Sequence, residues 1–140
     1  MFLIDTNVIS EARKQGRANA GVRAFFKTAA QQGEVLYLSA ITVGELRRGV
    51  ELIRHRGDGP QAALLDTWLT ELLAQYGHHL LDFTADAAQV WGRLQVPHAE
   101  HELDKQIAAI ALVNDLTVVT RNTDDFAASG ARLLNPFQPG

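Results

Sequence analysis

The sequence predicts an α/β sandwich in which a mainly parallel central sheet is flanked by helices. Short apolar runs that fit buried strands alternate along the chain with longer segments whose apolar residues recur at helical spacing. This alternation is typical of parallel sheets covered by helices. The 140 residues suit a single domain over 1–140, which buries roughly two-thirds of the surface that its unfolded chain exposes. Ligands bind to such sheets beyond the carboxyl ends of the strands.

The first half of the chain contains two predicted strands and four predicted helices. The strands are expected over 2–4 and 35–38, and the helices over 7–13, 22–32, 41–55 and 60–76. The second helix has an apolar stripe at i, i+3, i+4 and i+7, which consists of Val22, Phe25, Phe26 and Ala29. Pro60 follows a glycine-rich turn and suits the first turn of the fourth helix.

The second half continues the same alternation. A short strand is expected over 80–83, and Thr84 is a good N-cap for a helix that runs to about Gln95. The remaining expected elements are a polar linker over 97–102, a helix over 103–114, and strands over 117–120 and 132–134. Trp68 and Trp91 have apolar neighbours at helical spacing, so we interpret them as core residues.

Composition excludes several classes of protein. Cysteine is absent, which excludes disulfides and thiolate metal sites and fits a reducing cytoplasm. We expect a cytoplasmic location, because no basic leader precedes an apolar run and no apolar stretch approaches the roughly 18 residues of a membrane span. The net charge is -3, so the domain as a whole is not a basic nucleic-acid binder. Contact with RNA therefore requires local Arg and Lys side chains and bound cations.

Two acids follow the first two predicted strands. Asp5 ends the first predicted strand, and its alternative interpretation is a helix N-cap. Glu45 shares a helix stripe with apolar and small residues, so we expect its side chain to be half-buried and to need a partner. A nearby basic residue such as Arg48 or Arg23 is the ordinary partner for such an acid.

Further acids stand at two later helix starts. Asp104 leads an apolar helix face, in the first turn, where the helix dipole alone favours an acid by about 0.3–1 kcal/mol. Asn122, Asp124 and Asp125 follow the fourth predicted strand, where a cap and two ordinary first-turn acids are the alternative. If a helical turn begins near Thr123, Asp125 returns to the sheet edge, whereas Asp124 points about 100° away toward solvent.

All these acids are expected at one edge of the sheet, because each lies just past a strand or at a helix start. Converging carboxylates raise one another's pKa, and a divalent cation relieves that repulsion. Oxygen ligands suit hard cations such as Mg²⁺ or Mn²⁺. A pair of such ions can activate water for attack on a phosphodiester.

Four ordered motifs and a closing segment span nearly the whole chain. They are MFLIDTNVISE at 1–11, LSAITVGEL at 38–46, DKQIAA at 104–109, TRNTDDF at 120–126 and NPF at 135–137. In this order they resemble PIN-domain ribonuclease toxins of the VapC/FitB type. The resemblance implies a PIN fold and a Mg²⁺- or Mn²⁺-dependent endoribonuclease, the toxin component of a type II toxin–antitoxin pair.

The resemblance also implies site residues and partners. It carries catalytic metal-binding roles onto Asp5, Glu45 and Asp104, and it places a fourth acid at Asn122 or at Asp125. We choose Asp125, because a carboxylate supplies the charge that a second cation needs, and we interpret Asn122 as a contact through water or an alternative ligand. The implied partners are an RNA substrate, a second copy of the chain in a homodimer and a cognate antitoxin, with DNA contacted only through the antitoxin and no membrane.

A pair of histidines and a basic patch lie outside the four motifs. His98 and His101 have a spacing that some metal sites use, but the linker offers no further ligands nearby, so we interpret it as a solvated loop. A basic patch surrounds the end of the helix that carries Glu45, and it fits a solvated face, a phosphate-backbone contact or an acidic partner. Its members are Arg47, Arg48, Arg54, His55 and Arg56.

Two other functions fit parts of the pattern. A non-catalytic binding module on the PIN fold is disfavoured, because acids are intact at the three best-matched motifs. A phosphatase of the haloacid-dehalogenase type also starts from an Asp after the first strand, but it needs a second acid two residues later, where this chain has Asn7.

Overall fold

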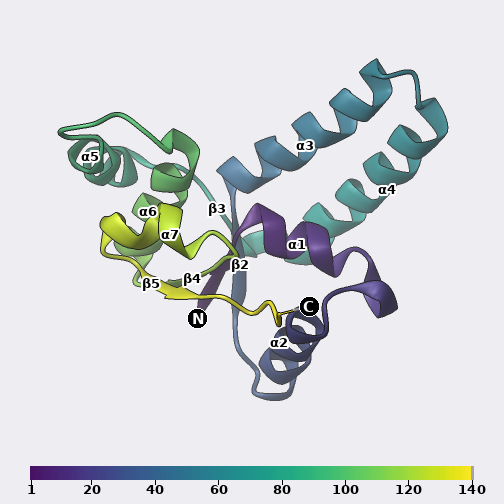
Figure 1. Ribbon diagram of the computed structural model, residues 1–140, viewed down its shortest axis with the longest axis horizontal. Coiled ribbons are helices and arrows are strands. Elements are labelled where there is room, and N and C mark those ends of the chain that lie inside the picture. Colours follow the sequence, from purple (N-terminus) through teal and green to yellow (C-terminus); the bar gives the residue numbers. More distant parts are fainter. Residues whose placement is uncertain (140) are drawn as a thin grey trace.

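Five parallel strands form one sheet within residues 1–139, the part of the chain that the computed structural model describes (Figure 1). The strands are β1 (Phe2–Ile4), β2 (Leu36–Ser39), β3 (Leu80–Leu81), β4 (Thr117–Val119) and β5 (Arg132–Leu134). Their order in space is β3-β2-β1-β4-β5, and all four pairings are parallel. The predicted parallel sheet flanked by helices is therefore confirmed, with β1 at its centre and β4 beside it.

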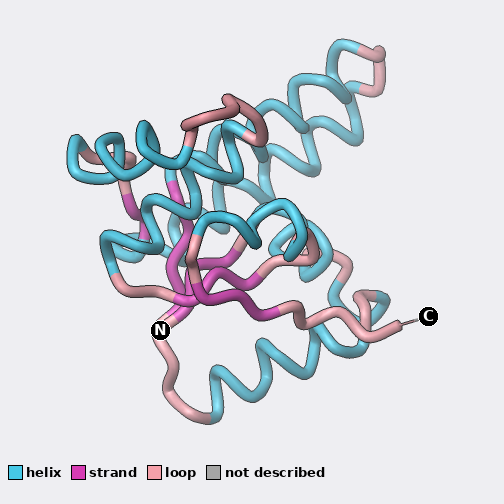
Figure 2. Tube along the Cα trace, turned by 60° about the vertical axis from the view of Figure 1, so that its left-hand side comes forward, coloured by secondary structure: helices cyan, strands magenta, loops and turns pink. Residues whose placement is uncertain are grey.

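Seven α-helices surround this sheet in the described residues (Figure 2). They are α1 (Thr6–Ala12), α2 (Ala20–Gln31), α3 (Ala40–His55), α4 (Gly59–Tyr76), α5 (Ala85–Leu94), α6 (Glu102–Asn114) and α7 (Thr123–Phe126). Short 3₁₀ turns cover Gln15–Arg17, Gly77–His79 and Ala127–Ser129. Each expected helix is present, with bounds that differ by one or two residues, as helix ends usually do.

Side chains that alternate along the strands divide the interior into two cores. Ile4 and Val119 are buried with residues of α1, α2, α3 and α4 on one face of the sheet. Leu3 and Val118 are buried with residues of α5, α6 and α7 on the other face. Neighbouring residues of β1 and β4 thus anchor both layers, which holds the carboxyl ends of these two strands rigidly in place.

The antiparallel hairpin of α3 and α4 extends away from the sheet (Figure 1). Arg47 and Arg54 of α3 each form ion pairs with both Glu51 and Asp66, so the network joins the two helices. These side chains are exposed, and exposed pairs of this kind contribute little stability. Two members of the expected basic patch are therefore paired within the chain.

The structure differs from the sequence-based expectation at three places. β3 ends at Leu81 rather than at residue 83, because its partner β2 ends at Ser39 and the ladder has no further residue to pair. Trp68 and Trp91 are half-buried at the rims of the two cores instead of inside them. Trp91 reaches a polar neighbour, since its indole N–H donates to the Glu102 carbonyl at 3.2 Å.

No helix within residues 1–139 combines the length and the apolar character that crossing a membrane requires.

Candidate active site

Asp5 occupies the centre of the candidate site. It follows β1 directly, caps α1 by accepting a hydrogen bond from the Thr6 amide at 2.8 Å, and is only 3% exposed. Its other carboxylate oxygen accepts a hydrogen bond at 2.7 Å from the hydroxyl of Thr120, the residue that follows β4. The capping and site interpretations of Asp5 are compatible, because its two oxygens have different neighbours.

The electrostatic environment of Asp5 disfavours its negative charge. Burial raises the pKa of Asp5 from 3.8 to about 6, although the hydrogen bonds from Thr120 and Thr6 oppose this change. The negative charges of Asp104 and Glu45 raise this pKa further. A buried carboxylate beside two other acids gains most from a bound cation.

Glu45 approaches Asp5 from the second turn of α3. Its side chain is half-buried, as expected, and it accepts a hydrogen bond at 2.7 Å from the hydroxyl of Thr6. The basic partner that sequence reasoning considered is wrong: Arg23 donates to the Ala18 carbonyl, and exposed Arg48 has no ion pair among residues 1–139. A hydroxyl satisfies one oxygen of Glu45 and leaves its charge uncompensated.

Asp104 enters the site from the first turn of α6. The alanine-rich stretch Ile107–Ala111 behind it is fully buried, so α6 lies close against the sheet and carries Asp104 to the edge. Asp104 is itself half-buried, and burial raises its pKa. The charges of Asp125 and Glu45 act in the same direction, whereas His101 acts in the opposite one.

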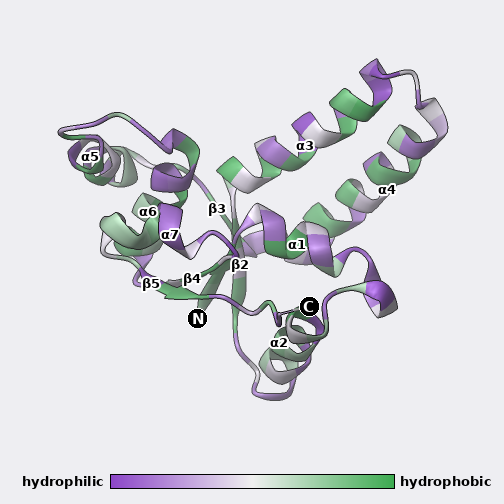
Figure 3. Ribbon diagram, viewed as in Figure 1, coloured by the Kyte–Doolittle hydropathy of each residue, from purple (hydrophilic) through white to green (hydrophobic). Residues whose placement is uncertain are grey.

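Asp125 lies beside Asp104, as the helical phase of its segment predicts. α7 begins at Thr123, and the fully buried Phe126 fixes this short helix against the second core. Asp125 is half-buried and raises the pKa of Asp104, whereas Asp124 is exposed. Figure 3 shows the beginnings of α6 and α7 in hydrophilic colours beside the hydrophobic strands.

Asn122 is exposed at the start of α7 and makes no side-chain capping bond. Its backbone amide donates to the Thr120 hydroxyl at 3.0 Å, so one hydroxyl links this loop to Asp5. The side chain of Asn7 adds a second link. Its Oδ1 accepts a hydrogen bond from the backbone amide of Arg121 at 3.2 Å, and its Nδ2 donates to the carboxylate of Asp5 at 3.4 Å.

Sequence reasoning did not single out Thr6 and Thr120, and it interpreted His101 as part of a solvated loop. Thr6 directly follows Asp5, and Thr120 directly follows β4, the strand beside β1. Their positions at the ends of neighbouring parallel strands are the signal that could have indicated them. The expectation that no further ligands lie near His101 is wrong. One donor atom each of His101, Asp104 and Asp125 lie within 4.8 Å of one another, although the linker and α7 are far apart in sequence.

The chemistry of the donor set fits a divalent cation. Carboxylates from the residue after β1 and from α3, α6 and α7 meet at one edge, and no Lys or Arg within residues 1–139 forms an ion pair with any of them. Hard oxygen donors with uncompensated charge are the ligands that Mg²⁺ and Mn²⁺ prefer. The acids that would hold such an ion are Asp5, Glu45, Asp104 and Asp125.

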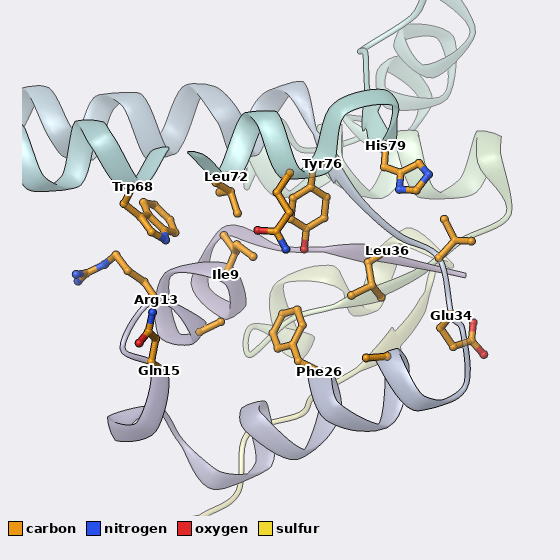
Figure 4. A pocket seen from close by; sticks show the side chains of 14 residues that line it. Ile9, Arg13, Gln15, Phe26, Glu34, Leu36, Trp68, Leu72, Tyr76 and His79 are labelled. Carbon is orange, nitrogen blue, oxygen red and sulfur yellow. The ribbon is translucent and has the colours of Figure 1, made fainter. Parts of the chain in front are cut away.

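A pocket of about 560 Å³ lies elsewhere, between α1, α2 and α4 (Figure 4). Phe26, Trp68, Leu72 and Tyr76 form much of its apolar wall, and none of the four acids lines it. Burial raises the pKa of Tyr76 to about 12, which fits an apolar cavity. This pocket is therefore separate from the cluster of four acids at the sheet edge.

A family model described as "PIN domain" matches residues 2–130. The chain belongs to the PIN-domain family. "VapC ribonuclease Y4jK" of Sinorhizobium fredii is 34% identical to this PIN domain, over 99% of both chains. "Toxin FitB" of Neisseria gonorrhoeae is also 34% identical, over 98% of this chain and 99% of its own.

A solved structure extends the similarity from sequence to fold. The crystal structure of FitAcB from Neisseria gonorrhoeae aligns with this PIN domain at a TM-score of 0.82 and 33% identity. The alignment covers 97% of this chain and 98% of that one. The similarity to VapC/FitB proteins that the motifs indicated is therefore confirmed.

Proposed function

We propose that the protein is a metal-dependent endoribonuclease that uses Mg²⁺ or Mn²⁺ and acts as the toxin of a type II toxin–antitoxin pair. The observation that carries the proposal is the meeting of four acids at one sheet edge: Glu45 and Asp104 lie beside Asp5, whose pKa burial raises to about 6, and Asp125 lies beside Asp104. The names of the two relatives, a VapC ribonuclease and the toxin FitB, support the same activity.

Each acid has a distinct part in this proposal. Asp5, held by Thr6 and Thr120, is the fixed ligand on which the others converge. Glu45 and Asp104 complete the inner ligand set, and their shared repulsion with Asp5 is the driving force for cation binding. An ion held by these acids would supply Lewis acidity and charge neutralisation for attack of water on the phosphodiester.

Asp125 is the outer acid of the site, because it approaches Asp104 and adds the charge that a second cation needs. Asn122 contacts this region through water, and exposed Asp124 is a solvated helix-start residue. This assignment places four acids in catalytic, metal-binding roles: Asp5, Glu45, Asp104 and Asp125.

The RNA backbone needs cationic side chains near the acids, because the net charge of the chain is -3. Exposed Arg121 meets this need, since its amide is bonded to Asn7 at the site and its guanidinium lies 4.7 Å from the centre of the Phe137 ring. This contact fixes an arginine beside the sheet edge, where it can bind a phosphate.

The proposed protein partner is an antitoxin whose C-terminal segment lies across the site in a cytoplasmic complex of toxin homodimers. Arg47, Arg48 and Arg54 are candidate contacts for it. Arg48 can contact the antitoxin without breaking an ion pair, whereas Arg47 and Arg54 must first break their ion pairs with Glu51 and Asp66. DNA is contacted only through the antitoxin.

RNA cleavage by the purified protein tests the proposed activity. Wild type, Asp104→Asn and Asp124→Asn are prepared in parallel and assayed with Mg²⁺, with Mn²⁺ and with a chelator. Cleavage should require a divalent ion, be abolished by Asp104→Asn and survive Asp124→Asn. Equal cleavage by wild type and Asp104→Asn would show that the activity is a contaminant or arises elsewhere.

Growth after expression tests the biological role separately. Wild type should slow growth when expressed alone and be harmless when it is expressed with the neighbouring gene, which we expect to encode the antitoxin. Asp5→Asn should be harmless in both cases. The toxin proposal fails if wild type and Asp5→Asn affect growth equally.

A further inference from the structure

His101 stands outside the four sequence motifs, yet it lies beside the outer acids of the site. Its Nδ1 atom is 3.9 Å from a carboxylate oxygen of Asp125. We propose that His101 is an additional metal ligand, which makes the outer part of the site prefer Mn²⁺ to Mg²⁺. This inference rests on the proposed function, since it concerns which ion the same site selects.

The three donor atoms can bind one ion once their side chains move closer together. Atoms bound to the same cation at about 2.1 Å lie at most about 4.2 Å apart. Only one pair of the three can lie on opposite sides of the ion, and adjacent ligands lie about 3 Å apart. The donors of His101, Asp104 and Asp125 lie within 4.8 Å of one another, so adjacent donors need to close by up to about 2 Å. The side chains of His101 and Asp125 are 46% and 40% exposed, which leaves them room to do so.

The linker before α6 is fixed at several points, which holds His101 near the acids. The Trp91 indole N–H donates to the Glu102 carbonyl, and the Lys105 ammonium group donates to the His98 carbonyl. The carbonyl of His101 accepts the Lys105 amide at 2.9 Å as the first bond of α6. Its imidazole makes no capping bond, so the ring is available to a cation.

The chemistry of imidazole gives the site its selectivity. Mg²⁺ demands oxygen ligands and dehydrates reluctantly, whereas a ring nitrogen suits transition-metal ions. Adding His101 to two carboxylates therefore favours Mn²⁺ at the outer position. The acids around Asp5 bring only oxygen donors and hold either ion.

Pulsed EPR of bound Mn²⁺ tests this ligand directly, because an imidazole nitrogen in contact with the ion modulates the electron-spin echo. The variants are His101→Asn and His101→Gly, both of which tolerate the left-handed backbone of this residue at φ 51°. His98→Gln is the matched control, since it alters a histidine of the same linker. The nitrogen modulation should be present in wild type and His98→Gln and absent from both His101 variants.

Calorimetric titration at pH 7.5 gives an independent measure. Both His101 variants should bind Mn²⁺ at least roughly tenfold more weakly than wild type, while their affinity for Mg²⁺ should stay within about twofold. Wild type without nitrogen modulation, or variants that lose affinity for both ions equally, would overturn the role of His101. RNA cleavage with Mg²⁺ separates this failure from that of the proposed function: if wild type cleaves and Asp104→Asn does not, the function stands whatever the role of His101.

Discussion

Asp5→Asn is expected to stabilise the metal-free protein at neutral pH, although it should abolish cleavage. Burial raises the pKa of Asp5 from 3.8 to about 6, and the charges of Asp104 and Glu45 add to this effect. One pKa unit corresponds to about 1.4 kcal/mol. Ionising Asp5 in the folded protein therefore costs about 3 kcal/mol more than ionising it in the unfolded chain.

The pH dependence of stability follows from the raised pKa of Asp5. The folded state binds the Asp5 proton more tightly than the unfolded chain, so the resulting stabilisation is complete below about pH 4 and is lost as the pH rises through about 6. An amide carries no charge at any pH and can still accept the Thr6 amide bond. Rearranging the bond with Thr120 costs about 1 kcal/mol, which leaves a net gain of about 2 kcal/mol above pH 7.

Urea unfolding in the presence of a chelator measures this gain. Wild type, Asp5→Asn and the exposed control Asp124→Asn are compared at pH 4.5 and pH 7.5. Asp5→Asn should be the more stable protein at pH 7.5, lose that advantage at pH 4.5, and fall below wild type once Mn²⁺ is added. The reasoning is refuted if wild-type stability is flat between pH 5 and pH 7, or if Asp5→Asn is no more stable at pH 7.5.

Further predictions concern the other site residues. Mn²⁺ or Mg²⁺ at 100 times its Kd should stabilise wild type by about 2.7 kcal/mol and raise its Tm, and Asp104→Asn should remove most of that rise; a Tm indifferent to both ions counts against a metal site. In RNA cleavage assays, Asp125→Asn should be strongly impaired, Asp124→Asn nearly silent and Asn122→Asp tolerated; damage confined to Asp124→Asn would contradict the assignment. Thr120→Val should reduce cleavage roughly tenfold, because it removes the bond to Asp5, whereas Thr120→Ser should retain activity; equal rates in the two variants would exclude a positioning role.

The order of elements was predictable because each depends on local patterns. The apolar runs at 2–4 and 117–120 favour strands, and the apolar stripe that begins at Val22 favours a helix. The fold has these same elements at these positions, so local preference and tertiary structure agree. The placement of Asp5 and Asp104 at one edge followed from the rule for parallel sheets. The phase of the short helix at Thr123 was enough to turn Asp125 toward Asp104.

Other features depend on contacts between distant segments, which local patterns do not encode. The hydroxyl of Thr120 bonds Asp5 across 115 residues, and Thr6 rather than an arginine became the partner of Glu45. His101 meets Asp125 only because α6 and α7 pack together on the second core. The apolar neighbours of Trp68 along its helix predicted a core position for it. Its ring instead lines the pocket, so one side of the ring is not packed against other residues.

The bond between Thr120 and Asp5 has a consequence for synthesis on the ribosome. Asp5 leaves the ribosome 115 residues ahead of Thr120, whose hydroxyl fixes it, and Asp125 follows later still. An incomplete nascent chain therefore lacks an assembled cleavage site. The proposed activity therefore arises only after translation has passed Asp125, and an inhibitor that recognises the assembled edge has its target from that same moment.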